Sequence, residues 1–221
     1  MPLTGSNPLP VAARFIASMV EEEAYQQDLV GFDPYLGWPS ITATEIRAPL
    51  SGAGGFNVVP DAVAISLDIR TVVGQSHPDL KARIQSRLDA LIEDANENLR
   101  EGRVRLLREA LEKPIPAGAY RASVIVLDDR PVTKTADDRA IVRSVVKAVE
   151  DRLATRAIVS GVPGATDGTW LWQAGIPIVT TGAGHRFVPP PGRRMGESTA
   201  IERRGGYLCR CRLSVPDENA G

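Results

Sequence analysis

The sequence predicts a mixed fold in which an antiparallel α+β unit is followed by a shorter α/β segment. Two segments with the period-two alternation of strands, 41–48 and 58–70, lie between two segments with the apolar face of a helix. Another strand-like segment follows the second helix, near residues 124–127. Helix and strand patterns then alternate up to residue 180, as they do in open α/β sheets.

Composition is typical of a globular chain and excludes several classes of partner. The 221 residues, 43% of them hydrophobic, suffice for one large domain or two small ones. Lys and Arg (26) nearly balance Asp and Glu (27), which argues against nucleic acid as a partner. The sequence has no long uncharged apolar window and no signal-peptide pattern at its start, so we expect no membrane association and a cytoplasmic location.

The first helix and the two strands have clear apolar patterns. Apolar residues recur at helical spacing from Val11 to Met19, and the glutamates that begin at Glu21 end this stripe before a Gly/Pro-rich stretch. The strand over 58–70 alternates strictly from Val63 to Ile69, which predicts one covered face. The Gly-rich stretch between the strands is too long for a two-residue turn and is predicted to be a loop.

The second helix is the strongest in the chain. Pro78 stands where a first helical residue belongs, and a continuous apolar face runs on to Leu99. Residues 103–120 stay ambiguous, because their charges could extend the helix while Pro114 and Pro116 must end it. The order up to residue 130 is that of a ferredoxin-like unit short of its first strand.

The second part has weaker patterns. A capping box at Thr135 predicts a helix with a buried valine stripe over 142–153, and a short helix near Trp170 precedes a strand over 176–180. We therefore predict one domain over 1–130 and a partial α/β domain over 131–189. Residues 190–221 are rich in Pro, Gly and Arg and are predicted to be disordered.

Several polar residues are candidates for chemistry. His77, at a helix start, is interpreted as a half-capping or solvated residue rather than a metal ligand, whereas for His185 a ligand role and a solvated loop role stay open. Asp167 is expected to cap the short helix. Cys209 and Cys211 are too few and too close for a structural zinc site or an ordinary disulfide.

Asn57 and Arg70 suggest a pair that binds substrate. Together they offer an amide donor and a guanidinium, which a substrate carbonyl and carboxylate would need. An ion pair between Arg70 and Asp68, on the same strand face, is the competing interpretation. The glycine loops that begin at Gly161 and Gly175 would let a ligand approach the backbone.

The motifs Asn57-Val-Val-Pro-Asp, Leu67-Asp-Ile-Arg, Gly161-Val-Pro-Gly-Ala-Thr-Asp-Gly-Thr and Gly175-Ile-Pro-Ile-Val-Thr-Thr-Gly-Ala-Gly occur in this order. In this order they resemble the zinc-dependent amidohydrolase and exopeptidase family of aminoacylase, acetylornithine deacetylase, succinyl-diaminopimelate desuccinylase and glutamate carboxypeptidase. The resemblance implies a ferredoxin-like dimerisation (lid) domain followed by the C-terminal part of an αβα zinc-peptidase catalytic domain. It also implies a homodimer through the lid and a small N-acyl amino acid or peptide as substrate.

The resemblance assigns roles to particular residues. Asn57 and Arg70 would hold the substrate's carbonyl and carboxylate from the lid, and Thr166 with Gly182 and Gly184 would line the pocket from the catalytic side. The intact family uses two zinc ions and a glutamate base, whose residues would precede Met1. We therefore expect no catalytic residue and no metal ligand in this chain, and no tight zinc binding or amidase activity by the chain alone. A noncatalytic dimerisation module is the alternative.

The family pattern also breaks off after Val188. If residues 190–197 are encoded CCA CCA GGC CGA CGA ATG GGT GAA, followed by T, reading one base later gives His-Gln-Ala-Asp-Glu-Trp-Val-Asn. That string is similar to the stretch in which the family places its last zinc-binding histidine. We therefore hypothesise that the chain is a fragment whose C-terminus, from about residue 190, is frameshifted.

Overall fold

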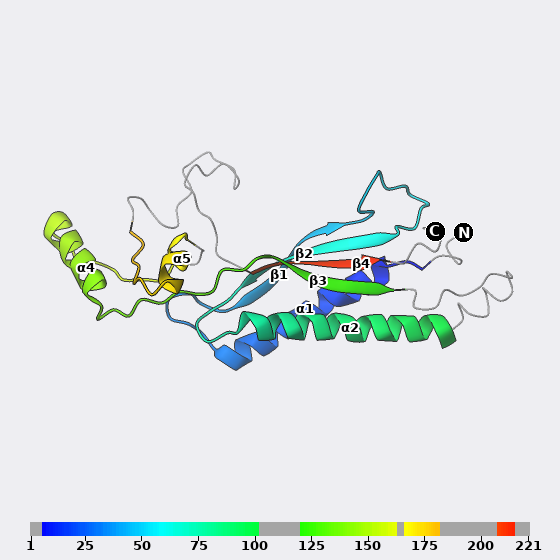
Figure 1. Cartoon of the computed structure of the whole chain (residues 1–221), viewed down its shortest axis with the longest axis horizontal. Helices are drawn as coiled ribbons and strands as arrows, with labels where there is room; N and C mark the ends of the chain where they lie inside the picture. The colour runs from blue at the N-terminus through cyan, green and yellow to red at the C-terminus, as the bar shows by residue number, and fades with distance from the viewer. Residues whose placement is uncertain (1–5, 102–119, 163–165, 182–206, 215–221) are drawn as a thin grey trace.

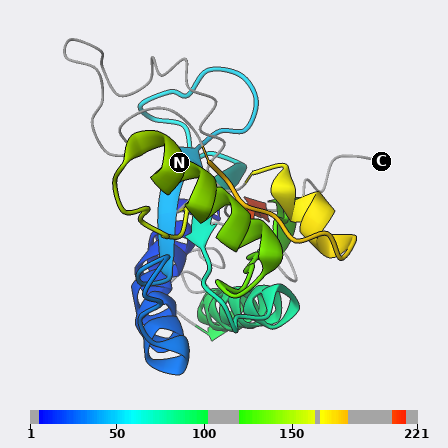
Figure 2. The same ribbon diagram turned by 90° about the vertical axis from the view of Figure 1, so that its left-hand side faces the viewer.

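The structure is a computed structural model, and it describes residues 6–101, 120–162, 166–181 and 207–214. Its main body is a four-stranded sheet with two long helices against one face (Figures 1 and 2). The strands are β1 (Ser40–Arg47), β2 (Ala62–Arg70), β3 (Arg121–Asp128) and β4 (Tyr207–Ser214). The sheet order is β1-β2-β4-β3, and every neighbouring pair is antiparallel.

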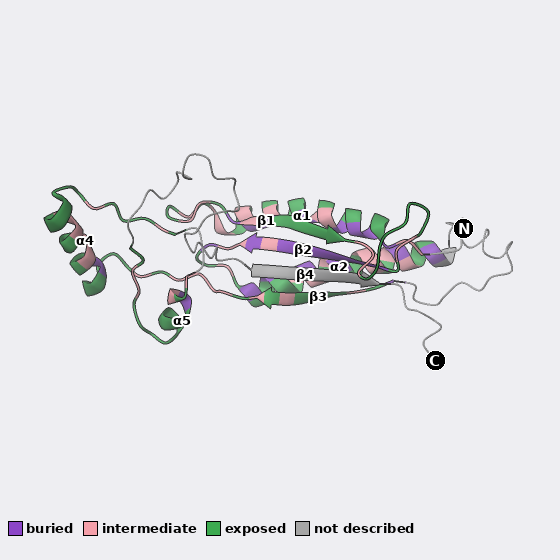
Figure 3. Cartoon of the chain, turned by 90° about the horizontal axis from the view of Figure 1, so that it is seen from above, coloured by how far each residue is buried: buried purple, intermediate pink, exposed green. Residues whose placement is uncertain are grey.

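The core lies between this sheet and the helices α1 (Leu9–Val30) and α2 (His77–Glu101). The strict alternation predicted for β2 is confirmed, since Val63, Ile65, Leu67 and Ile69 are all at most 1% exposed. Phe15 and Met19 of α1 and the apolar face of α2 pack against them. Figure 3 shows that β2 is mostly buried, whereas β1 is mostly exposed.

The predicted elements of the first part are confirmed with small changes at their ends. β1 and β2 lie within one to four residues of the predicted strands, and α2 begins at His77, one residue before the proline that marks it. The first helix, α1, continues through the glutamates to Val30 and ends at the start of the Gly/Pro-rich stretch. Most of the ambiguous segment 103–120 lies outside the described residues.

The expectation of disorder after residue 190 is wrong for residues 207–214. These residues form β4, which lies between β2 and β3. It pairs with β2 along its whole length and with β3 over residues 208–214. The missed signal is that apolar residues recur at every second position, at Tyr207, Cys209, Cys211 and Leu213, which is the period of a strand. The rest of 190–221 lies outside the described residues.

The second part differs more from its prediction. Its helices are α4 (Ala140–Leu153) and α5 (Gly168–Gln173), but residues 176–180 are not a strand. The reason is that a β-branched run becomes a strand only beside a partner, and none pairs with it among the described residues. Of the predicted valine stripe on α4, only Val142 is buried. The αβα domain is therefore not present as such in the described part.

Side-chain contacts hold this second part near the start of β1. Thr135 does not cap a helix, since its hydroxyl accepts a hydrogen bond from the Ile178 amide at 3.1 Å, and the Tyr35 hydroxyl donates to Asp137 at 2.9 Å. A Cβ on Gly161 would lie 2.6 Å from Tyr35, so this glycine permits close packing within the chain. None of the described helices is both long and apolar enough to cross a membrane.

Candidate functional site

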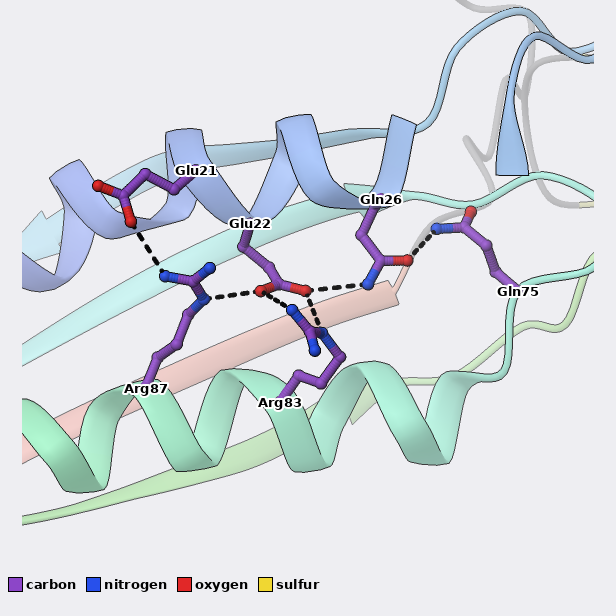
Figure 4. Close-up of polar contacts among 6 residues, drawn as sticks. All are labelled: Glu21, Glu22, Gln26, Gln75, Arg83 and Arg87. Carbon is purple, nitrogen blue, oxygen red and sulfur yellow. Dashed lines mark hydrogen bonds and ion pairs between the residues drawn. The ribbon is translucent and has the colours of Figure 1, made fainter. Parts of the chain in front are cut away.

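A buried carboxylate network joins α1 to α2 (Figure 4). Glu22 is fully buried, and both of its oxygens accept hydrogen bonds from Arg83, at 2.7 and 3.0 Å. Arg87 donates to one oxygen at 2.7 Å, and Gln26 donates to the other at 2.9 Å. Gln75, just before α2, donates to Gln26 at 2.8 Å and extends the network to the start of that helix.

The arginines keep Glu22 ionised despite its burial. Burial alone would raise the pKa of the carboxyl, but the hydrogen bonds from Arg83, Gln26 and Arg87 outweigh it and hold the pKa below its ordinary value of 4.5. The same bond raises the pKa of Arg83, whose guanidinium also lies 3.6 Å above the Tyr25 ring centre. Four hydrogen bonds from protein side chains occupy both oxygens of this carboxylate. The network therefore fixes the two helices against each other.

Sequence reasoning missed Glu22. The run of three glutamates suggested that the apolar stripe ends, whereas the helix continues and Glu22 falls on the stripe, three residues after Met19. Arg83 and Arg87 are spaced four apart, which places them on one face of α2. A glutamate on an apolar stripe, with two arginines spaced in this way on a facing helix, is the signal that could have found it.

The lowered pKa of Glu22 makes stability depend on pH. An unfolded glutamate takes up its proton near 4.5, whereas the folded one does so at lower pH, so the contribution of Glu22 is present above about 4.5 and is lost as pH falls through the folded pKa. We expect Glu22→Gln to flatten the fall in urea midpoint between about pH 7 and about pH 3, while exposed Glu21→Gln keeps it. An unchanged slope in Glu22→Gln would contradict this assignment.

A second group of polar residues gathers at one end of the sheet. β2 and β3 both run antiparallel to β4, so their C-terminal residues lie at the same end of the sheet. α2 begins at this end. Asp68 and Asp128 both lie opposite Leu208 in the register. We call this group the sheet-end cluster; its members are Asp68, Arg70, Thr71, His77, Asp128, Asp129 and Arg130.

Two short ion pairs lie in the sheet-end cluster. Arg70 donates to Asp68 at 2.7 Å, each side chain about a quarter exposed, and Arg130 donates to Asp128 at 3.2 Å. Of the two competing interpretations of Arg70, the ion pair with Asp68 is therefore confirmed. Arg130 Nη1 has no hydrogen-bond partner and is the one such buried side-chain atom in the described residues. The cluster thus holds guanidinium groups that can bind a carboxylate if the existing pairs rearrange.

His77 has a different environment from the predicted one. It is buried, with Nδ1 2.5 Å from Asp129 and Nε2 2.9 Å from the Thr71 hydroxyl. The expectation of a solvated histidine is wrong, because the fold brings the side chain of Asp129, 52 positions away in sequence, against the buried ring. His77 therefore ties the start of α2 to the ends of β2 and β3.

The structure separates the predicted substrate residues. Asn57 is exposed in the loop that joins β1 to β2, at the opposite end of β2 from Arg70. Thr166 precedes α5, which lies beyond the Arg70 end of the sheet (Figure 1). Asp167 occupies the N-cap position of α5 but makes no capping bond through its side chain. Gly182, Gly184 and His185 lie outside the described residues.

The described residues do not fit a zinc centre. In the ranges that the structure describes, no three His, Cys, Asp or Glu side chains are grouped so that they could hold a metal ion.

The four-stranded sheet and the helices α1 and α2 form a two-layer α+β unit. Residues 1–96 match the model of the peptidase dimerisation domain, M20_dimer, which covers α1, β1, β2 and most of α2. The match covers fewer than half of the 221 residues and shows that this segment is similar to that domain. No curated protein and no solved structure matches the chain.

Proposed function

We propose that this chain is the lid of a metal-dependent hydrolase that cleaves amide bonds of N-acyl amino acids or small peptides, joined to part of its catalytic domain. The observation that carries the proposal is the dimerisation-domain match over the α1-β1-β2-α2 unit. The motif order from Asn57 to the second glycine loop supports the substrate class. In this proposal the chain alone does not turn over substrate.

Within this proposal the sheet-end cluster is the substrate-facing part of the lid. Arg70 is a quarter exposed and lies at the end of the sheet from which the segment with Thr166 extends. A substrate carboxylate would compete with Asp68 for its guanidinium, as charge-assisted pairing allows. Thr166, Gly182 and Gly184 are the other proposed substrate contacts, whereas Asn57, at the opposite end of β2, cannot contact the same small substrate within one chain.

Two assays test the proposal. Purified protein is expected to bind zinc at far below one equivalent and to hydrolyse no N-acyl amino acid, because no group of His, Cys, Asp or Glu in the described residues could hold a metal ion. Metal analysis and an amidase assay with added zinc or cobalt measure this. Robust turnover would overturn the inactive-fragment proposal. The frameshift proposal is tested separately by the DNA, since codons that cannot give His-Gln in the shifted frame contradict it.

A noncatalytic dimerisation module is the second candidate, favoured because the family match covers the dimerisation domain alone. Light scattering after size exclusion should then give a discrete species of about twice the 23.7 kDa chain mass. A monomer or a polydisperse aggregate would contradict the module.

A further inference from the structure

β4 occupies a position that another part of the chain would hold in a ferredoxin-like unit. That unit has the order βαββαβ, and its first strand lies between the third and the fourth, antiparallel to both. Here α1, β1, β2, α2 and β3 follow the order from the first helix onward. β4, which comes last in the chain, lies between β2 and β3 and is antiparallel to both, so it holds the place of the first strand (Figures 1 and 3).

The register shows that the β4 sequence matches this slot. Its alternate residues Tyr207, Cys209, Cys211 and Leu213 lie opposite Ile69, Leu67, Ile65 and Val63, the core-facing residues of β2. On the other side, Cys211 lies opposite Val124, the buried residue of β3. The two arginine positions, 210 and 212, lie opposite Ser66 and Ala64 on the face away from the helices.

The slot cannot stay open in a stable sheet. Without β4, the facing edges of β2 and β3 would each have a row of unpaired backbone groups in the middle of the sheet. Ile65 and Leu67, which have no exposed surface, would lose the strand beside them. The slot is therefore a strand-binding site, and its ligand is an extended segment with alternating apolar residues.

The connection to β4 can reach the slot of another molecule. Residues 182–206 lie between the second part and β4, and a fully extended chain of this length spans about 80 Å. A strand on so long a connection has an effective concentration in its own slot of about the millimolar range, so a second copy can compete at high protein concentration. The contacts inside the sheet are the same whichever copy supplies the strand.

We propose that the slot between β2 and β3 is a strand-acceptor site and that a second copy of this chain can donate residues 207–214 to it, giving a strand-exchanged dimer. This goes beyond the proposed function and does not rest on it, because it depends only on the sheet order and register. A dimer formed by strand exchange has β4 of each copy in the sheet of the other.

Cysteine cross-linking tests the exchange. Ser66 and Arg210 are directly opposite, so their Cα atoms are within disulfide range. With both native cysteines replaced by alanine, a single chain with Ser66→Cys and Arg210→Cys should oxidise to a cross-linked monomer at low concentration. A mixture of chains that carry one substitution each, unfolded and refolded together at high concentration, should give a cross-linked dimer.

The matched control moves the second cysteine along the same strand. Arg212 lies opposite Ala64, so a cysteine there is diagonal to residue 66, and the cross-link should be lost. Failure of the doubly substituted chain to cross-link would overturn the slot assignment. A cross-linked monomer from that chain, with no dimer from the mixture, would overturn donation by a second copy. A lid dimer without exchange gives this second result, so the two kinds of dimer are distinguished.

Discussion

Replacing Glu22 by alanine is expected to lower the free energy of unfolding by about 3–5 kcal/mol. The substitution removes the carboxylate that both Arg83 and Arg87 bind and leaves two partly buried guanidinium groups without their common partner. It also opens a space on the apolar stripe of α1, since Glu22 has no exposed surface. Urea unfolding monitored by circular dichroism measures the change.

Glu21→Ala is the matched control. Glu21 is the preceding residue on α1, its side chain is 76% exposed, and it contacts only the rim of the network through Arg87 at 3.3 Å. Its loss should change stability by no more than about 0.5 kcal/mol. Equal effects of the two substitutions would show that the network contributes through general charge rather than through the buried geometry.

Replacing Cys211 by proline is expected to cost about 3 kcal/mol or more and to expose the centre of the sheet. Position 211 lies midway along β4, opposite Ile65 on one side and Val124 on the other. Proline removes a backbone donor there and is poorly tolerated in a strand with two neighbours. Hydrogen exchange should show that β2 amides, over 62–70, lose protection together with β3.

Asp217→Pro is the control for this substitution, because residue 217 follows β4 in sequence and lies outside its bounds. It should leave the exchange of β2 unchanged. If Cys211→Pro also left β2 protected, β4 would not be a structural part of the sheet.

The sequence predicts most of the elements around the core because their patterns are local. The alternation of β2 and the apolar faces of α1 and α2 report burial directly, and the structure confirms them. A strand-like pattern can also mislead when no neighbouring strand is available to pair with the segment. Residues 176–180 have the composition of a strand, yet no described strand pairs with them, and their apolar character alone does not make a ladder.

The parts that the sequence does not predict depend on contacts between distant residues. The contacts of His77 with Asp129 and of Glu22 with Arg83 join residues 52 and 61 positions apart. The local sequence around one residue of such a pair does not indicate which residue is its partner. The position of β4 is harder still, because period-two alternation over 207–214 indicates a strand but not which sheet or slot receives it. Asn57 and Arg70 are near each other in sequence, yet the length of β2 separates them.

Residues 207–214 complete the four-stranded sheet by pairing with β2 and β3. Hydrogen exchange with mass spectrometry on the intact wild-type chain tests this central claim most directly. The structure predicts that the amides of 207–214 exchange as slowly as those of β2, with which they pair along the whole strand. Exchange of 207–214 at the rate of an unstructured peptide, with β2 still protected, would contradict the claim.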